Sequence, residues 1–305
     1  MILDRKVSLV GAPLGLGGVH PGASLGPVGL RLAGLEERVR ALGLEFEDAG
    51  DIAVPDPGRV PPSDTSARYV EQIAEHCRNL RDRVESLLAR GRFPLIVGGD
   101  HAVACGSVAG VARHHGARGD RVGLIWFDAH GDMNTPTTSP SGNVHGMPLA
   151  CILGHGPGVL TELAGRVPMV SPRNAVLVGV HELDKHEKEL IRSSGVRIYT
   201  MREIDKMGMQ RVMEEALAIA CEGTVGFHLS FDVDGCDPSV APGTGTIVPG
   251  GTDFRESHLV MESVADTGRL LSLELTEVNP ILDVRNTTSE FAVGLIQSAL
   301  GKLIL

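Results

Sequence analysis

Residues 122–130, VGLIWFDAH, form a short apolar run that leads directly into ionisable residues. Apolar runs of this length are typical of strands that are buried on both faces of a parallel sheet. Similar runs recur along the chain, and helical patterns separate most of them. The other candidate strands are KVSLVGA (6–12), FPLIVGGDH (93–101), NAVLVGV (174–180), VRIYT (around 197–200), VGFHLSFDVD (225–234) and LLSLELTEV (270–278). About eight such units predict an α/β protein with a mostly parallel sheet, but periodicity alone does not separate an open sheet from an eight-stranded barrel.

The helical patterns between these runs support the same fold class. One helix is expected from about Pro27, where leucine and valine recur at roughly helical spacing. A longer amphipathic helix is expected within residues 66–91, with Gly91 in the position after the C-cap that helices favour. A last helical segment, SEFAVGLIQSALGKLIL (289–305), closes the chain. Since no stretch rich in Pro, Ser or charge divides the sequence, we expect one domain spanning residues 1–305.

Composition excludes several classes of partner. The 305 residues include 28 Lys+Arg and 38 Asp+Glu, for a formal charge of −10, and 42% are hydrophobic. An acidic chain without blocks of like charge is a poor candidate for binding nucleic acid or an anionic membrane. The sequence has neither a signal-peptide pattern nor an apolar stretch long enough to span a membrane. Five scattered cysteines argue against a disulfide framework or structural zinc, so we expect a reducing, cytoplasmic location.

Six potential metal ligands stand just past the ends of three predicted strands. They are His101, Asp128, His130, Asp132, Asp232 and Asp234. In an extended segment, side chains at i, i+2 and i+4 point the same way. D-A-H-G-D (128–132) is therefore expected to aim three ligands at one point, and D-V-D (232–234) two more. Because ligands gather outside the carboxyl ends of parallel strands, we expect all six to meet at one centre.

The chemistry of these six side chains predicts the metal. Each short motif alone is more often a turn or a helix cap, but four carboxylates and two imidazoles together would be costly without a counter-ion. This set, which lacks a thiolate, suits Mn²⁺ better than structural Zn²⁺. Six ligands are too many for one open catalytic ion, so two ions sharing bridging carboxylates are expected. Such a pair can hold a bridging hydroxide, which is a nucleophile for hydrolysis.

Four segments carry a resemblance to a known family. GGDH (98–101), DAHGDMNTPTTSPSGNVHG (128–146), SFDVDGCDPSVAPGTGT (230–246) and EVNP (277–280) resemble arginases, which belong to the ureohydrolase superfamily. The resemblance covers nearly the whole chain and implies an open three-layer α/β/α fold with two Mn²⁺ per chain. One ion would be bound by His101, Asp128, Asp132 and Asp232. The other would be bound by Asp128, His130, Asp232 and Asp234.

The resemblance also implies the reaction. Arginases hydrolyse the guanidinium group of L-arginine to L-ornithine and urea with a metal-bridging hydroxide. Glu277 follows an apolar run, can pair with a guanidinium, and matches the glutamate that binds it in the family. His145 resembles the family's proton shuttle or general acid, a role that suits an imidazole. Asp132 would accept a hydrogen bond from the hydroxide, and Thr246 would help to orient this end of the site.

Two loops would bind the α-amino and α-carboxylate end of the substrate. Asn134 and Ser141 match the positions where arginases contact the α-carboxylate, and Asn143 belongs to the same loop. Asp184 aligns with the aspartate that recognises the α-amino group. Asn and Ser are also ordinary turn residues, so only the family pattern assigns them to substrate. The expected partner is a small cationic guanidino compound.

Some positions depart from the family pattern. The family usually has Arg-Asp at His181-Glu182, a larger residue at Gly131, serine at Ala102 and proline at Ile247. None of these changes removes a ligand. They leave room for a shifted affinity or for a modified arginine such as N-hydroxyarginine as substrate. The nearest alternative is another ureohydrolase that acts on agmatine or a guanidino acid. Glu277 and the two metal sites argue against amide deacetylation, and the complete ligand set with His145 argues against a catalytically silent binding protein. By resemblance the chain is expected to form a homotrimer or homohexamer.

Overall fold

The computed structural model describes residues 6–20, 22–56 and 64–303. In these ranges eight parallel strands form one sheet in the order β2-β1-β3-β8-β7-β4-β5-β6. Its two edges, β2 and β6, do not pair with each other, so the sheet is open and is not a barrel. The strands are β1 (Lys6–Ala12), β2 (Glu45–Asp51), β3 (Phe93–Gly98), β4 (Gly123–Phe127), β5 (Ala175–Val180), β6 (Arg197–Thr200), β7 (Phe227–Asp232) and β8 (Leu270–Thr276). The parallel α/β prediction and the seven predicted strands are confirmed.

The eighth strand, β2, was not predicted. Its sequence, EFEDAGD, is mostly polar, and within it only Phe46 is buried. β2 lies at one edge of the sheet and pairs on one side with β1. A strand in this position does not need the continuous apolar run that identifies the central strands.

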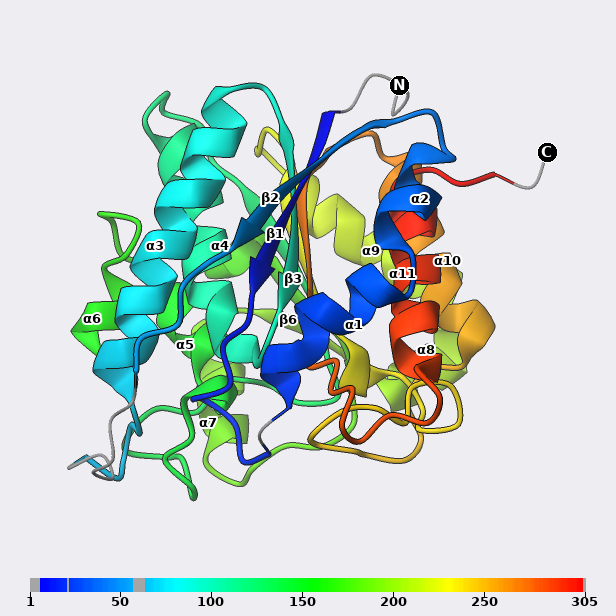
Figure 1. Ribbon diagram of the computed structural model, residues 1–305. Helices are drawn as coiled ribbons and strands as arrows, with labels where there is room; N and C mark the ends of the chain where they lie inside the picture. Colours follow the sequence, from blue (N-terminus) through cyan, green and yellow to red (C-terminus); the bar gives the residue numbers. More distant parts are fainter. Residues whose placement is uncertain (1–5, 21, 57–63, 304–305) are drawn as a thin grey trace.

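Helices cover both faces of the sheet, which gives three layers (Figure 1). One face carries α1 (Gly26–Leu32), α2 (Leu35–Arg40), α8 (Met201–Met207), α9 (Met209–Cys221), α10 (Phe254–Asp266) and α11 (Thr287–Ala299). The other face carries α3 (Val70–Ala89), α4 (Ala104–Gly116), α5 (Pro148–Ile152), α6 (Gly158–Thr161) and α7 (Glu187–Ser194). In the ranges that the structure describes, no helix has the length and apolar character needed to cross a membrane.

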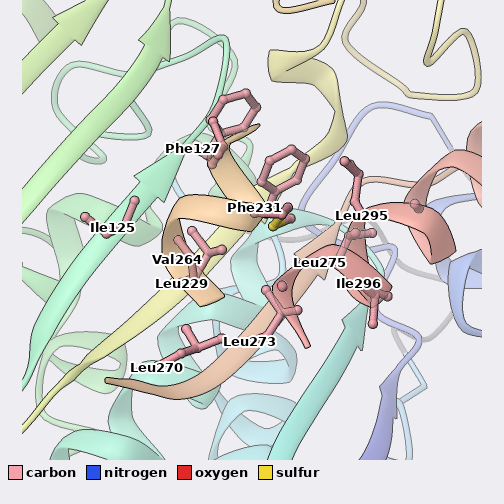
Figure 2. Packing of buried hydrophobic residues seen from close by; sticks show 14 of the residues in the cluster. Ile125, Phe127, Leu229, Phe231, Val264, Leu270, Leu273, Leu275, Leu295 and Ile296 are labelled. Atoms are coloured by element: carbon pink, nitrogen blue, oxygen red, sulfur yellow. The ribbon is translucent and has the colours of Figure 1, made fainter. Parts of the chain in front are cut away.

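Consecutive strand residues are buried on opposite faces. In β4, Ile125 and Phe127 belong to the hydrophobic cluster under α9–α11, whereas Leu124 and Trp126 belong to the cluster under α3–α5. Figure 2 shows the first cluster, where Phe127 stacks on Phe231 with ring centroids 4.2 Å apart. Both faces are apolar because every central strand is covered twice, which explains the continuous hydrophobic runs in the sequence.

One helix prediction was wrong in its extent. The helix expected from about Pro27 is broken into α1 and α2, because Gly34 adopts a left-handed backbone with φ of 80°. The prediction for Gly91 is confirmed: its φ is 69°, and the next amide, that of Arg92, donates back to the Leu87 carbonyl. Glycine suits both positions because positive φ is strained for other residues.

Candidate metal centre and substrate cavity

The predicted ligands converge at the carboxyl ends of the central strands. His101 follows β3, Asp128 follows β4, and Asp232 ends β7. The Nδ1 atom of His101 lies 3.1 Å from the Oδ2 atoms of Asp128, Asp132 and Asp232. These segments are adjacent because β3, β8, β7 and β4 are neighbours in the sheet. Together they form the first half of the candidate metal centre.

The second half is built around His130. Its Nδ1 atom lies 3.3 Å from Asp128 Oδ1 and 3.1 Å from Asp234 Oδ2. Two triads thus offer ligand atoms close enough to hold a metal ion: His101, Asp128 and Asp232, and Asp128, His130 and Asp234. Asp128 belongs to both triads, as expected for a carboxylate that bridges two ions.

The backbone geometry that produces this convergence differs from the prediction. The DAHGD segment is not an extended strand: Asp132 has a φ of 49°, and Val233–Gly235 form a 3₁₀ turn. Each leading aspartate instead accepts a backbone amide two residues ahead, His130 N to Asp128 Oδ1 at 2.7 Å and Asp234 N to Asp232 Oδ1 at 2.8 Å. These turns orient the carboxylates so that Asp128 directs Oδ1 at His130 and Oδ2 at His101, and Asp232 directs Oδ2 at His101.

The electrostatics of the centre favour positive charge among the carboxylates. Although burial opposes protonation of His101, the surrounding carboxylates raise its pKa well above the usual value. Burial and the charge of Asp128 raise the pKa of Asp132 to about 7 and that of Asp234 to about 6. Burial also raises the pKa of Asp128, but the two imidazoles outweigh it and hold this pKa well below its usual range.

The donor set fits divalent metal. Within residues 6–20, 22–56 and 64–303, no lysine or arginine lines the cavity above these carboxylates. The buried Nδ1 atom of His101 also makes no aligned hydrogen bond there, despite the three oxygens around it. The raised pKa of His101 means that a proton on Nδ1 balances these carboxylates in the metal-free protein, and a divalent ion placed between them would replace that proton.

Trp126 supports two ligands at once, and the sequence analysis missed it. Its Nε1–H donates to Asp128 Oδ2 at 3.0 Å. Its indole stacks on the His101 ring, with centroids 4.1 Å apart and planes 15° from parallel. A tryptophan within an apolar run carries no signal of such a role, because core packing explains it equally well.

Glu277 and His145 form a second polar group beside the ligands. The Oε1 atom of Glu277 accepts the His101 backbone amide at 2.9 Å and lies 3.1 Å from His145 Nδ1. Glu277 has a φ of 64°, and its own amide donates to the Gly99 carbonyl, which ties the end of β8 to the end of β3. Burial opposes the charge on His145, but Glu277 outweighs burial and raises the His145 pKa to about 9.

A cavity of about 260 Å³ opens above these groups. Apart from Asp128, which is buried, the predicted site residues line it: His101, His130, Asp132, Asn134, Ser141, Asn143, His145, Asp184, Asp232, Asp234, Thr246 and Glu277. The two predicted recognition loops touch each other, because Asn134 Nδ2 donates to Asp184 Oδ2 at 2.9 Å. The tertiary structure therefore brings the predicted metal and substrate residues around one space.

Glu187 joins the loops and was also missed. Its Oε1 accepts the Met133 amide at 2.9 Å, and its Oε2 accepts the Asp184 amide at 3.1 Å. Gly131 permits this approach, since a Cβ there would lie only 2.8 Å from Glu187 Oε1 and 2.7 Å from Leu183. Glu187 begins α7 in a charged stretch, where the sequence does not distinguish it from a solvated helix residue.

The departures from the family pattern lie around the centre without displacing a ligand. His181 contacts the carbonyls of Gly179 and Val248 through its two ring nitrogens. Glu182 lines the cavity, Ala102 is fully buried, and Ile247 is 48% exposed. Of these residues only Glu182 lines the cavity, and the six predicted ligand positions are intact.

Comparisons with known proteins agree with this geometry. A family model described as the arginase family matches residues 5–301. The chain is 48% identical to an arginase from Bacillus caldovelox, covering 99% of this chain and all of that protein, and the solved structure of the Bacillus caldovelox enzyme superposes with a TM-score of 0.95. An arginase from Bacillus subtilis is 45% identical over 99% of this chain and its own full length. An Entamoeba histolytica arginase solved with L-ornithine is 31% identical, covers 98% of this chain and 99% of that one, and has a TM-score of 0.90.

Proposed function

The chain belongs to the arginase family of metal-dependent ureohydrolases, and on that premise we propose that it hydrolyses L-arginine to L-ornithine and urea. The observation that carries the proposal is the convergence of three carboxylates on His101 Nδ1 beneath a cavity lined by the predicted substrate residues. Water would add to the guanidinium carbon while the bond to the side-chain nitrogen breaks, so that urea and ornithine leave.

We propose Mn²⁺ as the metal, with two ions per chain. His101, Asp128, Asp132 and Asp232 would hold one ion, and Asp128, His130, Asp232 and Asp234 the other. Oxygen and imidazole donors without a thiolate support this choice. When bound, the pair supplies an activated water as nucleophile and polarises the reacting group.

Glu277 and His145 would act on the guanidinium end. The Glu277 carboxylate is nearly buried, so its pairing with the substrate cation would be strong and would fix the orientation of the reacting carbon. His145, whose pKa is raised to about 9 by Glu277 against the effect of burial, would hold a proton at neutral pH. That proton would pass to the departing amine. Asp132 would accept a hydrogen bond from the attacking group, and Thr246 would orient this end.

The loops would bind the amino-acid end of the substrate. Asn134, Ser141 and Asn143 would contact the α-carboxylate, and Asp184 the α-amino group. A cavity of about 260 Å³ suits one small molecule. The L-ornithine complex of the Entamoeba histolytica relative supports an amino-acid ligand here.

We further propose that the chain forms one domain over residues 1–305, works in the cytoplasm and assembles as a homotrimer or homohexamer. The single sheet with a core on each face supports the first point. The scattered free cysteines support a reducing compartment.

A substrate panel tests the proposed reaction. Urea release from L-arginine, agmatine, 4-guanidinobutanoate and N-hydroxyarginine would be measured with Mn²⁺ added and after chelation. We expect the highest kcat/KM with L-arginine and no turnover without metal. Preference for agmatine or a guanidino acid would reassign the substrate, and preference for N-hydroxyarginine would make the modified amino acid the natural one.

A further inference from the structure

A carboxyl group that the proposed reaction does not use is buried directly behind the metal centre. Glu274 lies in β8 and is 0% exposed. It belongs to a row of residues that crosses the sheet on one face, in which Trp126 pairs with Ser230, Ser230 with Glu274, and Glu274 with Ile96. A carboxyl group is costly to bury, and no lysine or arginine is hydrogen-bonded to Glu274 in the described part of the chain.

The contacts of Glu274 lead to a metal ligand through one hydroxyl. Ser230 Oγ donates to Glu274 Oε1 at 2.8 Å. The same oxygen lies 2.8 Å from Nε2 of His101. A serine hydroxyl has a single proton, so once Ser230 donates to Glu274 it can only accept from His101.

These hydrogen-bond directions fix the tautomer of His101. Nε2 must carry a hydrogen, so in the neutral ring Nδ1 is the nitrogen with the free lone pair. Nδ1 is the atom that faces Asp128, Asp132 and Asp232. Without an acceptor at Glu274, Ser230 would be free to donate to Nε2 and favour the opposite tautomer, whose Nδ1–H cannot bind a metal.

We propose that Glu274, acting through Ser230, is a positioning residue that holds His101 in the tautomer and orientation needed to bind metal. The inference rests on the proposed metal centre and adds to it two residues that contact neither metal nor substrate. Hydrogen-bond partners behind a metal-bound histidine act in this way in many metalloproteins, and their loss weakens metal binding by about 10- to 100-fold.

The neighbouring row of the sheet supplies a matched control. Two residues before Ser230 and Glu274 in their strands, His228 of β7 pairs with Ser272 of β8. His228 Nδ1 lies 2.7 Å from Ser272 Oγ. Both residues are 0% exposed, as are Ser230 and Glu274. This second buried His–Ser pair lies on the same strands but does not include a predicted ligand.

Mn²⁺ binding to metal-free protein tests the proposal by calorimetry. The fluorescence of Trp126, the sole tryptophan, which stacks on His101, gives a second readout. Ser230→Ala and Glu274→Leu should lower the affinity for one of the two ions by about 10- to 100-fold and leave the affinity for the other within about threefold. Glu274→Gln retains a carbonyl acceptor and should bind both ions nearly as the wild type does. Ser272→Ala should leave both affinities within about threefold.

Folding and function are separated by further measurements. Urea unfolding of each metal-free variant shows whether the fold is retained. Leucine can fill the site of a buried carboxyl with little loss of stability. If Glu274→Leu does not fold, the Mn²⁺ affinity of Ser230→Ala tests the proposal. Wild-type Mn²⁺ affinity in folded Ser230→Ala, or an equal loss in Ser272→Ala, would overturn the inference. If wild-type protein itself does not bind two ions, the proposed two-metal function fails instead.

Discussion

The metal-binding ends of the strands and the substrate loops face the same cavity but are built differently. His101, Asp128 and Asp232 are each at most 2% exposed, and backbone amides or neighbouring rings fix their side chains. In contrast, Ser141 and Asp184 lie on exposed loops. Among the departures from the family pattern, His181 and Glu182 stand beside Asp184. On the proposed assignment, the buried strand ends would carry the reaction and the exposed loops would select the substrate.

The largest expected effect is at the strand ends. Asp232→Asn removes a carboxylate proposed to touch both ions, so we expect kcat for arginine to fall by about 10³-fold or more, since a metal pair contributes several kcal/mol to the transition state. Urea release and metal content per chain would be measured together. Asp237→Asn makes the same change five residues on, outside the cavity, and should retain both activity and metal. Near-normal turnover in Asp232→Asn would remove this residue from the metal centre.

The next effect concerns the stability of the metal-free protein, which the concentration of charge at the strand ends makes dependent on pH. In the metal-free protein, burial and Asp128 raise the pKa of Asp132 from 3.8 to about 7. The folded state then binds more protons than the unfolded state between these values, so the free energy of unfolding falls as pH rises from about 4 to 7. The loss from this group is about 2–4 kcal/mol.

Urea unfolding at several pH values checks this expectation. Asp132→Asn does not titrate, so its stability should fall less steeply than that of the wild type over the same window. Excess Mn²⁺ should reverse the trend, because the ions bind the deprotonated folded state. A wild-type stability that is flat or rises from pH 4 to 7 without metal would contradict the proposed charge cluster.

The smallest effect is expected in the loops. Ser141→Ala removes one hydroxyl proposed to contact the α-carboxylate, so kcat/KM for arginine should fall by about 10-fold, the value of one hydrogen bond to a charged group. Agmatine lacks that carboxylate, and its kcat/KM should change less than about twofold, since the lost contact is absent with this substrate. Steady-state kinetics with both substrates measures the difference. An equal loss for both would assign Ser141 to loop structure instead of recognition.

Sequence patterns predicted the central strands and the edge strand β6 but missed the other edge strand, β2. Strands covered on both faces need continuous apolar runs, and these runs identified β3, β4, β7 and β8. The edge strand β2 lacks such a run, and the break at Gly34 depends on one backbone angle that helical spacing does not report.

The candidate site follows the same division. The ligand types and their place after strands are properties of the sequence, and they suggested one centre. Ser230 and Glu274 were missed because their partners are distant in the chain: Ser230 and Glu274 are 44 residues apart, and Ser230 and His101 are 129 apart. Trp126 and Glu187 were missed although one partner of each is near in sequence, because an apolar run and a charged helix start explain these residue types equally well.

By itself, the sequence determined the α/β class, the six candidate ligands and the preference for a hard divalent metal. These follow from local apolar patterns and from the chemistry of single side chains. Apolar patterns and residue spacing left open whether the sheet is open and which carboxylate is shared; the tertiary structure shows an open sheet and Asp128 in both triads, and it alone showed that Asx-type turns, not extended backbone, orient the carboxylates. The reason is physical: strand order and side-chain direction arise from packing between segments that the sequence places far apart.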